Sequence, residues 1–288
     1  MAIQPGNHAR QRAAFSGFSR FMRITVNERE HHLPPGVTLA RLRSEIKPDA
    51  DLMIVNGYPA DADQRLAEGD QVVLIRRGEQ PAEEELDALL SARHSPGIQT
   101  RLRKACVGIA GVGGLGSAVA LALARLGVGQ LIVADFDMVE PSNLNRQQYF
   151  LDQIGLPKVY ALRDTLRRIN PHVRLTACHL KLTAANLGEI FTPVQVLVEA
   201  FDRVDQKVML VETFAACCPE TPIVTGSGMA GYEPANSIQT RQSGQRLFVC
   251  GDGETAAGPG VGLMSPRVGI VAHHQANAVL RLLLELAP

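Results

Sequence analysis

The sequence predicts an α/β fold in which a mostly parallel sheet carries helices on both faces and a small α+β domain precedes it. Three observations support this class. From Ala105 onward, short apolar segments alternate with helical ones, and a glycine-rich turn joins the first apolar segment to its helix. Before them, several short strand-like segments surround one short helix. Alternation of this kind is typical of parallel sheets whose ligands bind at the carboxyl ends of the strands.

Residues 22–80 have the pattern of the small α+β domain. Apolar and polar residues alternate from Met22, and Glu28-Arg29 predicts a hairpin turn before the chain returns. Thr38 stands where it can cap a short helix. Residues 1–21 have weak periodicity and predict a flexible lead-in. The expected elements of this domain are strands at 22–27, 31–33, 51–55 and 71–75 and a helix at 38–46.

A helical linker is expected at residues 81–98, because Pro81 and three acidic residues favour a helix start. Residues 99–288 form the second domain, with a Rossmann-like sheet. Its expected strands are 106–110, 131–134, 173–177, 196–200 and 222–225, followed by later strands at 238–241 and 247–250. Its expected helices are 115–126, 158–169, 184–190, 204–217 and 266–286, and residues 251–262 predict a glycine-rich crossover loop.

Composition excludes several classes of partner. The chain has 29 basic and 29 acidic residues, so its overall charge gives no reason to expect nucleic acid or a membrane surface. No apolar run reaches the roughly 20 residues of a membrane span. The five cysteines form no C-x-x-C pair, which argues against a disulfide framework and against a zinc site. We therefore expect a cytoplasmic protein without zinc.

The glycine-rich turn Gly111-Val112-Gly113-Gly114-Leu115-Gly116 predicts phosphate binding. Glycines let the backbone approach a phosphate closely, and the next helix offers its free N–H groups. Asp135 ends the following strand, where a carboxylate can bind ribose hydroxyls or simply cap a turn. These features fit a nicotinamide-dependent oxidoreductase equally well, so they predict a nucleotide site and no particular reaction.

The loop after the strand that ends in Asp135 indicates which kind of nucleotide-binding protein this is. Residues 135–147, DFDMVEPSNLNRQ, closely resemble the DxDxVxxSNLxRQ signature of the ThiF/MoeB/HesA family, the bacterial relatives of ubiquitin-activating enzymes. Pro157-Lys158, Ile169-Asn170-Pro171 and Glu199-Ala200-Phe201-Asp202 fall where the family has its PK, NP and strand-end Asp motifs. The stretches EAFD, SGMAGY, CGDG and SPRVG are most similar to the short, zinc-less ThiF branch.

The resemblance implies a role for each residue of the nucleotide site. Asp135 would bind the ribose of ATP, and Asp202 would hold Mg²⁺ at the α-phosphate while acting as a catalytic residue. The basic side chains would contact the phosphates and would also serve catalysis. The implied nucleotide-binding residues are Gly111, Gly113, Gly114, Gly116, Asp135, Asp137, Asn143, Arg146 and Lys158, of which Arg146 and Lys158 also serve catalysis.

Two further candidates come from the same resemblance. Family members form dimers that take an arginine from the partner subunit, and Arg93 is the candidate for this contribution, with a plain helix-end cation as the alternative. Cys250 lies near where relatives place a sulfur-transfer cysteine, so it is a candidate nucleophile, with a buried strand cysteine as the alternative. A homodimer is therefore expected.

The first domain resembles the β-grasp sulfur carriers of the ThiS and MoaD type, through VNG near its middle and EGDQVVLI at its last strand. A working carrier ends in Gly-Gly, whose free carboxylate reacts. Here the strand continues into Arg76-Arg77-Gly78-Glu79 without Gly-Gly. The segment is therefore expected to be a carrier-like accessory domain and not the activated carrier.

Together the motifs predict a ThiF-type adenylyltransferase. It would use Mg-ATP to adenylate the C-terminal carboxylate of a ThiS-like sulfur carrier in thiamine thiazole synthesis and release pyrophosphate. Two alternatives remain open at this stage. One is the NAD-dependent oxidoreductase, which would leave Lys158 and Asp202 without a role. The other is a non-catalytic scaffold that mimics a carrier.

Overall fold

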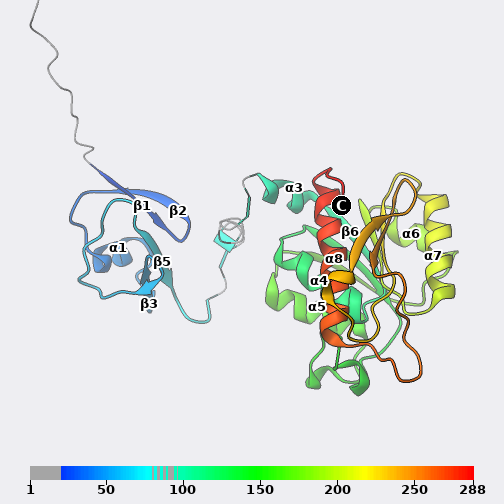
Figure 1. Cartoon of the computed structure of the whole chain (residues 1–288). Helices are drawn as coiled ribbons and strands as arrows, with labels where there is room; N and C mark the ends of the chain where they lie inside the picture. Colours follow the sequence, from blue (N-terminus) through cyan, green and yellow to red (C-terminus); the bar gives the residue numbers. More distant parts are fainter. Residues whose placement is uncertain (1–20, 80, 83–84, 87–88, 90–93, 96) are drawn as a thin grey trace, which may run out of the picture. The chain divides into compact units, whose positions relative to one another are not determined.

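The computed structural model describes residues 21–79, 81–82, 85–86, 89, 94–95 and 97–288 (Figure 1). Contacts divide the chain into two compact units, Met1–Leu89 and Leu90–Pro288. Residues 1–20 of the lead-in expected at 1–21 and most of the helix expected from Pro81 lie outside the described residues.

In its described residues, the first unit is a five-stranded sheet with one helix, α1 (Leu39–Ile46), packed against it. The strand order is β2 (Arg29–Leu33), β1 (Met22–Val26), β5 (Gln71–Ile75), β3 (Leu52–Val55) and β4 (Tyr58–Pro59). Alternate residues of the strands enter the core, where Ile24 and Leu74 meet Leu42 of α1. Thr38 caps α1 by accepting the Arg41 N–H, as the sequence predicts.

The hairpin between β1 and β2 turns one residue earlier than expected. Asn27 and Glu28 both have positive φ, at 45° and 66°, which suits the tight turn of a two-residue hairpin. Asn27 also accepts the Leu74 N–H at 2.8 Å and donates to the Leu74 carbonyl at 3.1 Å. These bonds to β5 fix Asn27 in the turn, an effect of tertiary structure that local pattern does not reveal.

The second unit is a seven-stranded doubly wound sheet. The strand order is β11 (Gln239–Gln242), β12 (Leu247–Gly251), β10 (Ile223–Gly226), β9 (Val196–Glu199), β6 (Cys106–Ala110), β7 (Gln130–Asp135) and β8 (Arg174–His179). Neighbouring strands are parallel except β11, which pairs antiparallel with β12. This arrangement confirms the predicted fold class.

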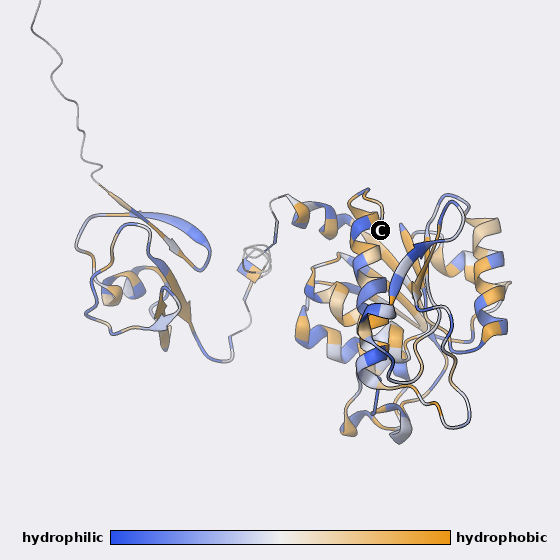
Figure 2. Ribbon diagram, viewed as in Figure 1, coloured by the Kyte–Doolittle hydropathy of each residue, from blue (hydrophilic) through white to orange (hydrophobic). Residues whose placement is uncertain are grey.

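Helices cover both faces of this sheet, because successive residues of each strand point into cores on opposite faces. Val107 and Ile109 of β6 face one cluster, whereas Ala110 and Leu197 face the other. The first cluster includes α3 (Ile98–Lys104), α4 (Gly114–Arg125), α5 (Lys158–Ile169) and α8 (Ser265–Leu283), and the second includes α6 (Leu187–Phe191) and α7 (Val204–Cys217). Figure 2 shows hydrophobic colours along the central strands and both colours on the helices.

Three helices differ from the sequence expectation by more than one residue, of which α8 ends at Leu283, three residues before the predicted end. α3 begins at Ile98, where only a short lead into the sheet was expected, because Ile98 and Leu102 pack against the first core. α6 begins at Leu187, three residues later than predicted. Among the helices of the described residues, none is long and apolar enough to cross a membrane.

Candidate nucleotide site

The strand order reverses at β6. From β6 the chain runs to β7 and β8 on one side and returns to β9 and β10 on the other. At such a switch point the connections leave in opposite directions, so a crevice opens at the carboxyl ends of the strands. The glycine turn of residues 111–116 follows β6 and leads into α4 at this edge. The fold therefore places the predicted phosphate-binding turn where doubly wound proteins bind ligands.

The glycine turn is tightly closed. Gly111 has φ +86°, in the left-handed region that favours glycine. A Cβ at Gly116 would fall far inside van der Waals contact of the Gly111 carbonyl oxygen. The first turn of α4 therefore packs directly on the loop, with its N-terminal N–H groups near the glycines.

Asp135, the last residue of β7, contacts this turn directly. Its carboxylate accepts the Val112 N–H at 2.8 Å and the Asp137 N–H at 2.8 Å. Burial raises the pKa of the Asp135 carboxyl, although both hydrogen bonds and the Lys158 charge act against the rise. The residue thus organises the loop as a turn-forming carboxylate and lies beside the glycine turn.

Lys158 is buried at the start of α5 and paired. Its Nζ lies 2.7 Å from Asp137 Oδ2, and its side chain is 7% exposed against 48% for Asp137. The backbone repeats the link, since the Lys158 N–H donates to the Asp137 carbonyl at 2.9 Å. Because the Asp137 N–H binds Asp135, the chain of contacts runs from Lys158 to the glycine turn.

Arg146 and Asn143 come from the loop between β7 and α5. Arg146 Nη1 donates to Asn145 Oδ1 at 2.9 Å and to the Ser142 carbonyl at 3.2 Å, which leaves other guanidinium N–H groups available. Its Cγ lies 3.7 Å from the position of a Cβ on Gly114. Asn143 is buried, and its Oδ1 accepts the Glu140 N–H at 3.0 Å. Asn143 thus shapes the loop that brings Arg146 to the glycine turn.

Asp202 follows β9 in an exposed turn. The residues just before it pack on the glycine turn: a Cβ at Gly111 would lie 3.0 Å from the Ala200 carbonyl oxygen and 3.1 Å from Phe201 Cδ1. The Ala200 N–H also donates to the Ala110 carbonyl at 2.9 Å. The Asp202 turn and the glycine turn are therefore neighbours at the switch point.

Two polar side chains that the sequence analysis did not select also hold the glycine turn. Tyr149 donates its hydroxyl to the Val112 carbonyl at 2.7 Å, and Ser117 donates to the Gly113 carbonyl at 2.5 Å. Gln147 is buried, and its Oε1 has no hydrogen-bond partner among the described residues. The sequence analysis did not select Gln147 either, although the RQ ending of the loop signature, at Arg146-Gln147, could have identified it.

Cys250 lies apart from this arrangement in β12. Its side chain is 0% exposed, its Sγ is 3.6 Å from Thr240 Oγ1, and burial raises the pKa of the thiol to about 11. These properties match the alternative reading of a buried strand cysteine and oppose a nucleophilic role, because the reactive form is the thiolate. Arg93 lies outside the described residues.

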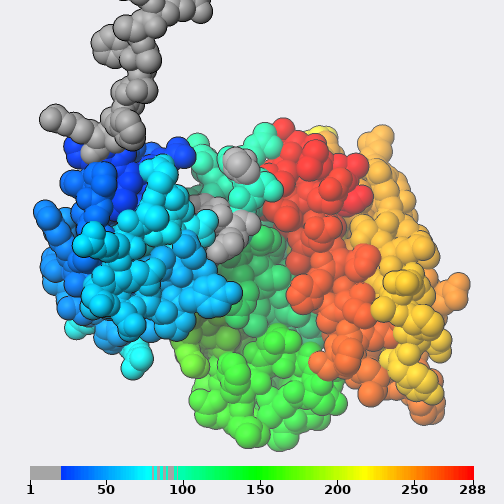
Figure 3. All heavy atoms as spheres, turned by 60° about the vertical axis from the view of Figure 1, so that its left-hand side comes forward, coloured from blue at the N-terminus to red at the C-terminus, as the bar shows by residue number. Residues whose placement is uncertain are grey.

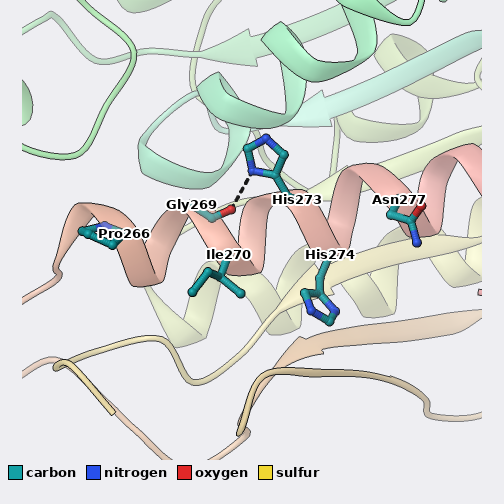
Figure 4. A pocket seen from close by; sticks show the side chains of 6 residues that line it. All are labelled: Pro266, Gly269, Ile270, His273, His274 and Asn277. Atoms are coloured by element: carbon teal, nitrogen blue, oxygen red, sulfur yellow. Dashed lines mark hydrogen bonds between the residues drawn. The ribbon is translucent and has the colours of Figure 1, made fainter. Parts of the chain in front are cut away.

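A shallow groove on α8 is lined by Pro266, Gly269, Ile270, His273, His274 and Asn277 (Figure 4). His273 bonds the Gly269 carbonyl at 2.8 Å, and His274 contacts Thr240 Oγ1 at 3.0 Å. The two imidazoles point to different sides of the helix (Figure 4). In the part of the chain that the structure describes, no three His, Cys, Asp or Glu side chains gather as a metal cluster.

The doubly wound sheet, its glycine turn and the strand-end carboxylates define the class of nucleotide-binding α/β proteins. The chain belongs to the ThiF family, which residues 86–288 match, and residues 22–78 match the ThiS-like ubiquitin family. Both matches confirm the family resemblance and the β-grasp character of the first unit.

Two curated relatives are adenylyltransferases. The chain is 35% identical over 191 residues to molybdopterin-synthase adenylyltransferase of Escherichia coli (strain K12), an alignment covering 64% of this chain and 75% of the relative. It is 36% identical over 149 residues to sulfur carrier protein adenylyltransferase of Thermus thermophilus, covering 50% of this chain and 54% of the relative.

Among solved structures, the chain resembles E. coli tRNA N6-threonylcarbamoyladenosine dehydratase in complex with ATP, with a TM-score of 0.62 and 22% identity. The alignment covers 68% of this chain and 92% of that one. Similarity at this level of identity confirms the fold.

Proposed function

We propose that this protein uses ATP to adenylate the C-terminal carboxylate of a ThiS-like sulfur carrier and releases pyrophosphate. The arrangement of Arg146, Lys158 and Asp202 around the glycine turn carries the proposal. Arg146 packs on the glycine turn, Lys158 reaches it through Asp137 and Asp135, and the Asp202 turn packs on Gly111. Adenylyltransferase relatives and family membership support the same reaction.

The proposed reaction needs charge and orientation more than a strong base. The carrier carboxylate is itself the nucleophile at the α-phosphate, and pyrophosphate leaves. Arg146 can hydrogen-bond two phosphate oxygens at once, while Lys158 supplies a point charge that Asp137 holds in place. Asp135 would orient the ribose from the end of β7.

The carboxylates present fit Mg²⁺. Magnesium is commonly held by one or two carboxylates together with substrate phosphates and water. Asp202 is exposed at the switch point and can be such a carboxylate. When bound with ATP, the ion would neutralise charge that develops on the phosphates. The chain's part is to hold Asp202 in place.

The substrate is proposed to be a separate carrier in thiamine thiazole synthesis. The ThiS-like unit continues past β5 into Arg76-Arg77-Gly78-Glu79, so it presents no terminal Gly-Gly carboxylate of its own. The five cysteines are free thiols, in keeping with the proposed reducing, cytoplasmic setting.

A homodimer belongs to the proposal. The connection between β7 and α5 exposes Phe136, Met138, Phe150, Leu151, Ile154 and Leu156, with Leu151 78% exposed. This connection lies in the green lobe at the lower edge of the second unit in Figure 3. Because an apolar surface of this kind marks an interaction site, it suits a second copy of the chain, with Arg93 proposed to act across the interface.

Pyrophosphate exchange into ATP, measured with a separately produced ThiS-like carrier ending in Gly-Gly, tests the proposal. We expect carrier-dependent exchange in the unmodified chain and a loss of about 100-fold or more in Asp202→Asn, as for other groups that act on developing charge. Asp164→Asn, which changes an exposed carboxylate on α5, is the matched control and should retain exchange.

Absence of exchange with every carrier tested would contradict the proposal and favour the non-catalytic scaffold. Undiminished exchange in Asp202→Asn would contradict the role of this residue alone. Tight binding of NADH together with no binding of ATP would favour the oxidoreductase.

A further inference from the structure

Glu199 is a buried carboxylate at the edge of the site. It is the last residue of β9, it pairs in register with Ala110 at the end of β6, and it is 0% exposed. A buried charge is costly unless it is paired and hydrogen-bonded. The network around Glu199 therefore has to satisfy both of its oxygens.

Lys207 of α7 supplies the opposite charge. Its Nζ lies 3.0 Å from Glu199 Oε1 and 2.8 Å from Oε2, and it donates to the Gly226 carbonyl at 3.0 Å. These three acceptors match the three N–H donors of an ammonium group. Thr225 of β10 adds a hydroxyl bond to Glu199 Oε2. The carboxylate thus ties β9 to α7 and β10.

The backbone at Glu199 is held from α8. Gln275 is 0% exposed, and its Nε2 donates to the Glu199 carbonyl at 3.0 Å and to the Val224 carbonyl at 3.4 Å. The end of β9 is therefore fixed from three neighbouring elements before the chain enters the turn of residues 200–202.

One further bond links this network to the site. The Phe201 N–H donates to Glu199 Oε1 at 2.7 Å. Phe201 packs against Gly111, and Asp202 is the next residue along the chain. Glu199 therefore uses one oxygen to set the backbone direction of the turn that carries Asp202.

Stability alone does not account for such a pair. Replacing a buried ion pair by apolar side chains is often neutral or stabilising, because the charges need not be desolvated. An apolar pair could fill the same space but could not accept the Phe201 N–H. The charged pair therefore provides orientation of the turn.

We propose that Glu199 and Lys207 are positioning residues, which hold the turn so that Asp202 faces the glycine turn and can receive the cation of metal-bound ATP. The inference rests on the proposed function, since it concerns the same site. It predicts that loss of the pair weakens the response of ATP binding to Mg²⁺, while binding of ATP without Mg²⁺ persists.

Equilibrium binding of ATP to the full chain, with and without Mg²⁺, tests this in three variants. Lys207→Met should reduce the Mg²⁺-dependent gain in ATP affinity by about 10-fold, a typical effect of outer residues that orient a metal ligand. Lys207→Arg keeps the charge and should recover most of that gain. Lys181→Met, at an exposed lysine of the same unit, should behave as the unmodified chain.

The double variant Glu199→Leu/Lys207→Met covers the case in which Lys207→Met does not fold, because it leaves no unpaired buried charge. We expect it to fold and to lack the Mg²⁺-dependent gain. A folded double variant with the full gain would overturn the inference, as would a Lys207→Arg variant as impaired as Lys207→Met. Because no carrier is added, this result is independent of whether the unmodified chain shows carrier-dependent exchange.

Discussion

Cys250 has a thiol without exposed surface, held in β12 between the strands β10 and β11. Burial raises its pKa to about 11, so the thiol is protonated near neutral pH. The thiol therefore lacks both access and charge. At the scale of single residues, this separates the fully buried Cys250 from Asp135, which is only partly buried and contacts the glycine turn.

We therefore expect Cys250→Ala to retain carrier-dependent pyrophosphate exchange within about twofold, since adenylation needs no thiolate. Labelling with a thiol reagent under native conditions provides a second measurement. The exposed Cys217 should react first, and Cys250 should react only on unfolding. A large loss of exchange in a folded Cys250→Ala variant would restore the catalytic assignment.

Asp252 and Arg267 form a buried ion pair that joins secondary-structure elements. Arg267 of α8 donates to Asp252 and to the Glu233 carbonyl at 2.8 Å, which ties the loops before β11 and after β12 to the helix. Burial raises the pKa of the Asp252 carboxyl, but N–H groups of Glu254 and Thr255, the Thr255 hydroxyl and Arg267 outweigh it and hold the pKa well below the ordinary 3.8.

Because this pKa is lower in the folded state, the stabilisation is present above pH 3.8 and is lost as the pH falls through the folded-state pKa. Asp252→Asn leaves Arg267 unpaired and should lower the free energy of unfolding by about 3 kcal/mol at pH 7. Urea unfolding at several pH values should show the difference from the unmodified chain narrowing toward acid. A difference that does not change with pH would contradict this account of the pair.

Alanine substitutions at two helical glycines are expected to change stability in opposite directions. A Cβ at Gly116 in α4 would collide with the Gly111 carbonyl, whereas one at Gly269 in α8 meets nothing within 4 Å. Gly116→Ala should therefore weaken both folding and nucleotide binding, and Gly269→Ala should stabilise the chain by about 0.5–1 kcal/mol through helix propensity. Thermal unfolding of both variants checks this, and equal effects would refute the proposed closure of the turn.

The elements themselves could largely be predicted from the sequence. Strand β6 and helices α5 and α7 begin and end where hydrophobic periodicity placed them, because their apolar patterns are long and regular. The hairpin at Asn27 could not be placed, since its position depends on bonds to β5. The pairing of Glu199 with Lys207 depends on the packing of α7 on the sheet, so the motif suggested Asp202 but not its supports.

At the scale of the whole molecule, the apolar connection between β7 and α5 is the clearest candidate for self-association. Leu151 is 78% exposed and Phe150 is 50% exposed, so a charge at Leu151 should cost the monomer little. We expect Leu151→Glu to shift the chain from dimer to monomer in light scattering during size-exclusion chromatography, with unfolding unchanged. A dimer that persists in the variant would place the interface elsewhere.

The two units have different roles in the proposed reaction. The second unit contains the glycine turn, Asp135, Lys158 and Asp202, while the ThiS-like unit resembles the proposed substrate without its reactive end. Family membership and the fold are consistent with adenylation by the second unit of a carrier supplied separately.

Mass spectrometry of a ThiS-like carrier ending in Gly-Gly, incubated with the protein, ATP and Mg²⁺, tests the central claim most directly. The account predicts that the carrier gains one adenylyl group at its C-terminus, that a carrier lacking the terminal glycine does not, and that the fused ThiS-like unit stays unmodified. An unmodified carrier, in the presence of protein shown to bind ATP, would contradict the account.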